Sequence, residues 1–191
     1  MSAAGSFRHA AAVVIAVTTA ALGMSPVASG CGLEPAIQSG FTVSHPGSLD
    51  IAVAVADARR AGVLPQADPN AASNEVQLRN MLADLGRLQT RLNGGRSAFP
   101  TSPAEPFSLV LVGPGLWSHY HGTPGGVMGE YHTDGPVAGQ VVVLTHYAVL
   151  RMLLRGDLSV GQASDLGLIA FAGSDTVPVR NAFENGFRST T

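Results

Sequence analysis

The hydrophobic pattern of the chain changes its period near residue 107, and this change constrains the fold more than any other feature. Before it, Leu78, Leu82, Leu85, Leu88 and Leu92 recur at three- and four-residue spacing, which is typical of a helix with one buried face. After it, residues 107–112 form a continuous apolar run, which favours a buried strand. This change of pattern therefore predicts an α+β fold, in which helices and strands occupy separate parts of the sequence.

Two helices are predicted in the N-terminal half. The first covers residues 47–61, with Arg59 and Arg60 in its last turn, where cations interact favourably with the helix dipole. Its helical pattern rests on the spacing of the apolar residues Leu49, Ala52, Val53, Ala56 and Val63. The second covers residues 73–92 and is expected to stop at the glycines of residues 93–95. A proline-rich linker is expected over residues 96–106.

The C-terminal half predicts a small sheet with helices packed on it. The expected strands are 107–112, 126–132, 140–144 and 168–172, and glycines make residues 122–129 resemble a flexible loop. Thr145 is the expected cap of a helix that Gly156 ends, and Ser159 that of a short helix that runs to Leu166. A last helix is expected to carry Phe183 on its apolar side. The order predicts a mostly antiparallel sheet with C-terminal helices packed on it, in a single domain over residues 47–191.

The composition argues against nucleic-acid binding. The chain has 11 basic and 13 acidic residues, so its formal net charge is −2. A protein that binds nucleic acid needs a basic patch to displace counterions from the phosphates. Charged residues make up only 13% of the chain and apolar residues 46%, which is enough to bury a sizeable core.

The N-terminus has the organisation of a signal peptide. Arg8 supplies a short positive region, residues 10–22 form an uncharged apolar run, and the small residues 28–30 lead to Cys31. We therefore expect residues 1–30 to be a signal peptide and the protein to be exported. Two alternatives remain open: an uncleaved anchor, for which the apolar run is short, and secretion with Cys31 as an incidental thiol.

The residues around Cys31 resemble the lipobox of bacterial lipoproteins, in which a small residue precedes a cysteine that is acylated. Ala28 departs from the pattern, because lipoboxes usually carry Leu or Val at this position. Cys31 is the only cysteine, so it cannot form a disulfide within the chain. The resemblance implies a lipid anchor at Cys31, a tether over residues 31–46, and a location in the periplasm or at the cell surface, bound to a membrane.

Residues 134–187 resemble the sterol carrier protein type-2-like domains. The resemblance rests on the runs Val141–Thr145, Leu153–Ser159 and Gly167–Gly173, which carry small and apolar residues rather than chemistry. It implies an apolar cavity between a curved sheet and its helices, and a lipid-like ligand. The residues expected at such a cavity are Trp117, Tyr120, Leu150 and Leu154. For Trp117, packing in the core is the alternative.

The stretch of sequence with the most potential metal ligands contains three histidines. If residues 117–121 are extended, His119 and His121 point to one side, and His132 could join them as a third ligand. Three neutral imidazoles with an open fourth position suit Zn or Cu. The alternative is that these histidines are solvated polar residues beside a glycine-rich loop.

No complete catalytic constellation is present in the sequence. The motifs Gly-x-Ser-x-Gly, His-Glu-x-x-His, the P-loop and Gly-x-Gly-x-x-Gly are all missing. The sequence therefore predicts a binding protein without enzymatic activity or a cofactor. Its partner is expected to be an apolar or lipid-like ligand, with an envelope protein as the first alternative and a metal ion as the second.

Overall fold

The computed structural model describes residues 45–67, 73–96 and 105–188. Its first elements are the two predicted helices, α2 (Ser48–Arg60) and α3 (Asn74–Arg96). Cys31 and most of the predicted tether lie outside these residues, as does the greater part of the proline-rich linker. Within the described residues, no helix is long and apolar enough to cross a membrane.

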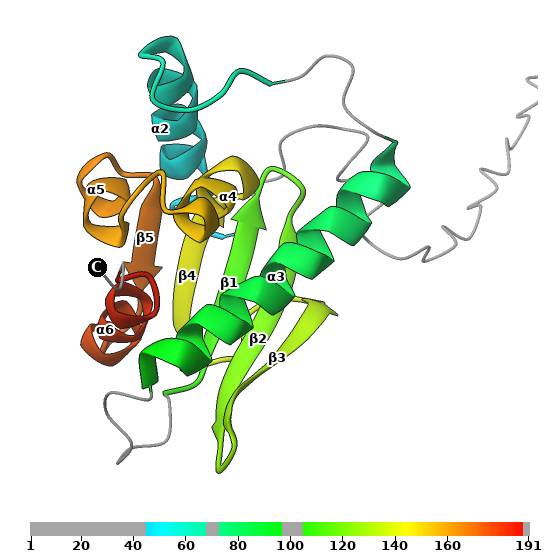
Figure 1. The fold of residues 1–191 in the computed structure, drawn as a ribbon, viewed down its shortest axis with the longest axis vertical. Coiled ribbons are helices and arrows are strands. Elements are labelled where there is room, and N and C mark those ends of the chain that lie inside the picture. The colour runs from blue at the N-terminus through cyan, green and yellow to red at the C-terminus, as the bar shows by residue number, and fades with distance from the viewer. Residues whose placement is uncertain (1–44, 68–72, 97–104, 189–191) are drawn as a thin grey trace, which may run out of the picture.

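A five-stranded sheet forms the centre of the fold (Figure 1). Its strands are β1 (Phe107–Val112), β2 (Leu116–Thr123), β3 (Gly126–Thr133), β4 (Val141–His146) and β5 (Ile169–Ala172). Their order across the sheet is β3-β2-β1-β4-β5. All neighbours are antiparallel except the central pair, β1 and β4, which run parallel.

Three helices complete the fold: α4 (Tyr147–Arg155), α5 (Val160–Asp165) and α6 (Val177–Gly186). Helix α3 crosses one face of the sheet diagonally, and α4 and α6 lie on the same side (Figure 1). The α+β class is confirmed, with two N-terminal helices, a mostly antiparallel sheet and C-terminal helices packed on it.

The predicted order of elements lacks strand β2, and the expected flexible loop over residues 122–129 is wrong. The strand ends at Thr123 and β3 begins at Gly126, so the two form a tight hairpin. Two glycines of β3 leave space for neighbouring side chains. A Cβ on Gly126 would lie 2.5 Å from Oδ1 of Asn93, and one on Gly129 would lie 2.6 Å from the ring of Tyr131.

Helix α3 continues to Arg96 and does not stop at residues 93–95 as predicted. The glycine there serves close packing rather than helix termination. A Cβ on Gly95 would lie 2.6 Å from the backbone nitrogen of Gly186 in α6, and one on Gly186 would lie 3.0 Å from the carbonyl oxygen of Arg91. The two helices therefore approach each other backbone to backbone where each carries a glycine.

The start of α4 also differs from the prediction by one residue. Thr145 belongs to β4, where its hydroxyl donates to the carbonyl of Leu168 at 3.0 Å. The cap is His146, whose Nδ1 accepts the backbone N–H of Ala148 at 3.0 Å. The predicted cap Ser159 is confirmed, with a complete capping box at the start of α5.

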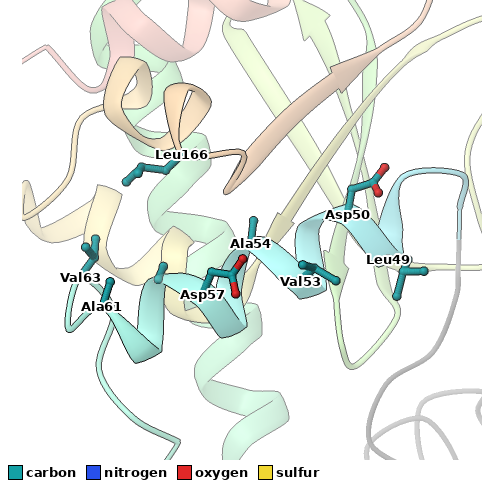
Figure 2. Close-up of a pocket in the computed structure, with 9 residues that line it drawn as sticks. Leu49, Asp50, Val53, Ala54, Asp57, Ala61, Val63 and Leu166 are labelled. Atoms are coloured by element: carbon teal, nitrogen blue, oxygen red, sulfur yellow. The ribbon is translucent and has the colours of Figure 1, made fainter.

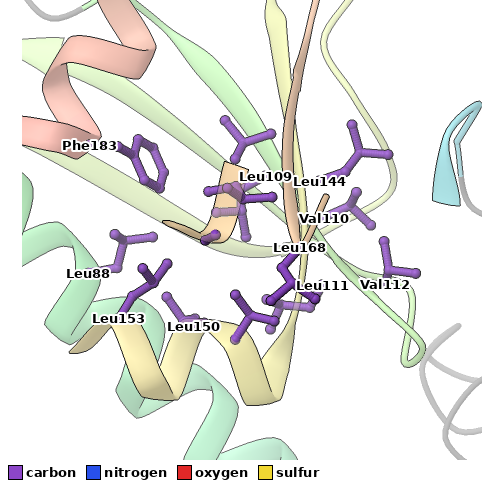
Figure 3. Packing of buried hydrophobic residues seen from close by; sticks show 14 of the residues in the cluster. Leu88, Leu109, Val110, Leu111, Val112, Leu144, Leu150, Leu153, Leu168 and Phe183 are labelled. Atoms are coloured by element: carbon purple, nitrogen blue, oxygen red, sulfur yellow. The ribbon is translucent and has the colours of Figure 1, made fainter. Parts of the chain in front are cut away.

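Both faces of the central strands β1 and β4 are buried. On the helix side, Phe107 stacks on Tyr120 at 4.8 Å between ring centroids and meets Phe183 of α6 edge to face. Figure 3 shows the leucines of β1, α3 and α4 converging in this core. On the other face, the ring of Trp117 lies 6.1 Å from that of His45, just before α2. The chain before α2 therefore helps to cover the second face.

Candidate functional site

Helix α2 carries apolar side chains on two opposite faces. Ile51, Val55 and Ala58 are buried and fix the helix to the rest of the fold. Leu49 and Val53, which the sequence pattern placed with the buried residues, are exposed instead. The outward pair therefore adds nothing to the core of the described structure.

The outer side of α2 forms an open groove of about 470 Å³ (Figure 2). Figure 2 shows Leu166, which follows α5, on the far side of this groove from the helix. The groove is lined by Leu49, Asp50, Val53, Ala54, Asp57, Ala58, Ala61, Val63 and Leu166. We call this surface the α2 groove.

Exposed apolar side chains concentrate in the α2 groove. Leu49 is 60% exposed, Val53 52%, Leu166 46% and Val63 38%. Only four other large apolar residues of the described chain are comparably exposed: Val76, Met128, Val137 and Val177. Single exposed apolar residues are common on protein surfaces, but a contiguous set is typical of an interaction site.

Two carboxylates border the α2 groove. Asp50 and Asp57 stand about two turns apart on α2, so they lie on the same side of the helix. Asp57 pairs with Arg60 in an exposed ion pair, which contributes little to stability. Asp50 takes part in none of the ion pairs formed between residues that the structure describes. The groove therefore combines apolar side chains with two carboxylates.

A second, more polar pocket of about 620 Å³ lies at the histidine-rich hairpin. Nε2 of His119 lies within hydrogen-bond distance of the carbonyl oxygen of Gly135, at 2.6 Å, and of the hydroxyl of Thr133, at 3.2 Å. His132 sits in a bulge between paired residues of β3 and has a φ of 65°. Both histidines line the pocket, together with Glu130 and Asp134.

The predicted metal site is not formed. His121 is exposed and does not line the pocket that contains His119 and His132. Across the residues that are described, no group of three or more His, Cys, Asp or Glu side chains is placed to hold one metal ion. His121 is the histidine that stands apart, because it pairs with Met128 of β3, two residues beyond His119 towards the hairpin turn.

The residues predicted to line an apolar cavity lie in the packed core. Tyr120 and Leu150 are almost fully buried, and Trp117 is 6% exposed. The hydroxyl of Tyr120 donates to the carbonyl of Leu85 at 3.3 Å, which ties β2 to α3. Leu154 is partly buried against the same core. None of these four side chains lines either of the two pockets described above.

Sequence reasoning missed the α2 groove, although its signal is present. Leu49 and Val53 form one apolar pair at four-residue spacing, and Ile51 and Val55 form another. Two such pairs shifted by two residues point to opposite sides of a helix, since two residues correspond to about 200° of rotation. The pattern therefore contained one apolar pair more than a single buried face can use.

Comparison with known proteins gives no relative. No protein-family model, no curated protein and no solved structure matches this chain. The likenesses to lipoproteins and to sterol carrier protein type-2-like domains therefore stay predictions from the sequence.

Proposed function

We propose that this protein is an exported, membrane-anchored accessory protein that binds a protein partner through the α2 groove. The observation that supports this most is a cluster of exposed apolar residues at α2, a helix whose other face is already buried. Leu49 and Val53 lie on the helix itself, Val63 follows it, and Leu166 follows α5. The proposal assigns no catalytic role to any residue.

The shape and charge of the α2 groove favour a protein over a lipid. Pockets for small ligands enclose most of the ligand surface, whereas this groove is open to solvent. Asp50 and Asp57 line the groove, and their negative charges repel the anionic head of a fatty acid or phospholipid. The complementary partner is an amphipathic helix with apolar side chains that insert beside Val53 and basic side chains about two turns apart.

The N-terminal sequence supplies the second part of the proposal. The apolar run 10–22 and the single cysteine at position 31 support export followed by attachment to a membrane. Mass spectrometry of the protein purified from bacterial envelopes measures this directly. We expect a chain that begins at Cys31 and carries acyl groups, and an unmodified Cys31 would contradict the anchor without affecting the groove.

A designed helical peptide can probe the groove in place of the natural partner. The probe is a fluorescent peptide of Leu and Lys, with the two Lys positions about two turns apart, and the control is the same peptide with Glu in place of Lys. We expect the full chain to bind the Lys peptide in fluorescence anisotropy and to leave the Glu peptide unbound. Equal binding of both peptides would contradict the proposed charge complementarity.

Matched variants locate the binding surface. Leu49→Gln together with Val53→Gln should weaken binding of the Lys peptide at least tenfold, because the two most exposed apolar side chains that line the groove are lost. Val177→Gln is the control, since Val177 is 61% exposed but lies on α6. Asp50→Asn with Asp57→Asn should reduce the dependence of binding on salt. The proposal would be overturned if the Leu49 and Val53 variant bound the Lys peptide as well as the natural chain does. It would also be overturned if the natural chain bound anionic phospholipid vesicles and this variant did not.

A further inference from the structure

Three exposed arginines meet where α3 packs against α4. Arg87 and Arg91 are about one turn apart on α3, and Arg151 lies on α4, which contacts α3. Nη2 of Arg91 donates to the carbonyl oxygen of Leu154 in α4 at 3.2 Å, so this side chain crosses the junction of the two helices. We call the surface formed by Arg87, Arg91 and Arg151 the arginine cluster.

A buried carboxylate connects the arginines of the two helices. Asp84 is 5% exposed, and its Oδ1 accepts from Nη1 of Arg87 at 2.7 Å. Its Oδ2 accepts from the hydroxyl of Tyr147 at 2.9 Å. The guanidinium carbon of Arg151 lies 5.8 Å from the centre of the Tyr147 ring. A continuous chain of contacts therefore runs from Arg87 on α3 to Arg151 on α4.

These contacts orient the three guanidinium groups and leave most of their donors free. A guanidinium has five N–H donors, and the hydrogen bonds to Asp84 and Leu154 each use one donor of Arg87 and Arg91. Arg151 meets Tyr147 through the face of the ring, as cations commonly do. The side chain of Arg87 is 73% exposed, and Arg91 and Arg151 are exposed as well. The remaining donors are therefore accessible to a ligand.

The arginine cluster has more positive charge than its surroundings balance. Asp84 is the only acidic residue of α3 after the first turn, and α4 has none. This single carboxylate can balance one of the three positive charges. Arg79, which also lies on α3, is paired with Glu75 at 3.4 Å instead. The excess of positive charge favours a ligand with several negative charges.

We propose that the arginine cluster binds the headgroup phosphates of an anionic membrane. The fork of a guanidinium matches the oxygens of a phosphate, with which it forms paired hydrogen bonds. None of the three arginines lines either pocket described above, so the cluster suits a surface of many phosphates better than one enclosed ion. The choice of a membrane rests on the anchor in the proposed function. A lipid chain and a basic patch together hold a protein at a membrane more firmly than either alone.

The test compares two kinds of phospholipid vesicle. Binding of the full chain is measured by flotation with vesicles of phosphatidylcholine alone and of phosphatidylcholine mixed with phosphatidylglycerol. We expect stronger binding to the anionic vesicles, and the difference should shrink as salt is added. Equal binding to both kinds of vesicle would overturn the proposal. Release from the anionic vesicles by inorganic phosphate at constant ionic strength would assign the cluster to a soluble phosphate, and would overturn it too.

Two double variants with the same change in net charge locate the contact. Arg91→Gln with Arg151→Gln should weaken binding to the anionic vesicles about tenfold, and Arg87 is kept because it pairs with the buried Asp84. The control is Arg60→Gln with Arg79→Gln, since both arginines are exposed outside the cluster. This variant should bind the vesicles like the natural chain. Equal weakening in both variants would overturn the proposal, because net charge alone would then account for binding.

The Leu49→Gln and Val53→Gln variant separates the arginine cluster from the α2 groove. It keeps all three arginines, so it should bind the anionic vesicles like the natural chain while it loses the Lys peptide. Loss of vesicle binding in this variant would place the membrane contact in the groove and overturn the proposal. Equal binding of the natural chain to both kinds of vesicle would contradict the cluster alone and leave peptide binding by the groove unaffected.

Discussion

The two N-terminal helices use their apolar residues in different ways. Helix α3 buries Met81, Leu85, Leu88 and Leu92 along a single stripe, and charged residues such as Arg79 occupy its outer face. Helix α2 buries one apolar face and exposes a second. The structure thus contains one helix whose main apolar stripe is buried in the core, and one helix that carries a second apolar pair, Leu49 and Val53, outside the core.

This difference separates stability from recognition. Burial of an apolar side chain stabilises the fold, whereas an exposed one contributes nothing until another molecule covers it. Leu88 and Leu49 are both helix leucines, yet the first is 0% and the second 60% exposed. The comparison therefore yields substitutions that should act on folding alone or on binding alone.

The largest effect is expected for Leu88→Ala in α3. The substitution removes fully buried methyl groups and leaves a cavity in the core, so the free energy of unfolding should fall by about 3 kcal/mol or more. Urea denaturation followed by circular dichroism measures it. Leu49→Ala in α2 is the matched control and should change the free energy of unfolding by less than about 0.5 kcal/mol. Equal losses of unfolding free energy in both variants would show that Leu49 contributes as much to folding as Leu88 does.

A smaller effect on stability is expected from pH, through the titration of His146. The pKa of His146 is lowered to about 4 by burial and by Arg59, whereas in the unfolded chain it has its ordinary value of 6.5. The unfolded state therefore binds more protons between these values, and stability is full above pH 6.5 and falls as the pH drops towards 4. The contribution of His146 to this loss is about 2–3 kcal/mol.

His146→Asn isolates this contribution, because asparagine can still cap α4 but does not titrate. Thermal unfolding at several pH values should show a flatter dependence between pH 6.5 and 4 in this variant. A loss of stability equally steep in the variant and the natural chain would place the responsible group elsewhere.

A further effect concerns the edge of the sheet that α3 protects. The amide of Asn93 accepts the N–H of Val127 at 2.5 Å and donates to its carbonyl at 3.1 Å, and Gln89 accepts the N–H of Gly129 at 3.0 Å. These side chains replace the strand that β3 lacks on its outer side. Asn93→Ala should lower the free energy of unfolding by about 1–2 kcal/mol and increase aggregation measured by light scattering. Unchanged aggregation would show that the edge is protected by other means.

The smallest effect on stability is expected for Leu49→Gln combined with Val53→Gln. Because both side chains already face solvent, the midpoint of urea denaturation should remain close to that of the natural chain. The same variant is expected to lose the binding of the Lys peptide. A large loss of stability would show that α2 uses both of its apolar faces for folding.

The sequence predicted the elements whose pattern depends on local spacing. The leucines of α3 and the apolar run of β1 identified their elements, and Ser159 marked the start of α5. The hairpin of β2 and β3 was not predicted, because its glycines resemble those of a flexible loop. Gly126 leaves space for Asn93, and this contact between residues distant in sequence leaves no local signal. Gly129 leaves space for the ring of Tyr131.

The candidate sites were harder to predict than the fold. The three histidines predicted a metal site because imidazole is a common metal ligand. The bulge at His132, however, could not be inferred from the sequence. The α2 groove alone could have been found from the sequence, through the second apolar pair on α2.

The parallel pairing of β1 and β4 has a consequence for how the chain folds. It joins residue 109 to residue 143, so a long loop must close before the centre of the sheet exists. The hairpin of β2 and β3 needs only local contacts. We therefore expect the hairpin to form early and the central strand pair to limit the folding rate, as is usual where contacts are distant in sequence. Until that step, the apolar residues of β1 and β4 are open to wrong pairing, and the yield of folded protein depends on how fast these two strands meet.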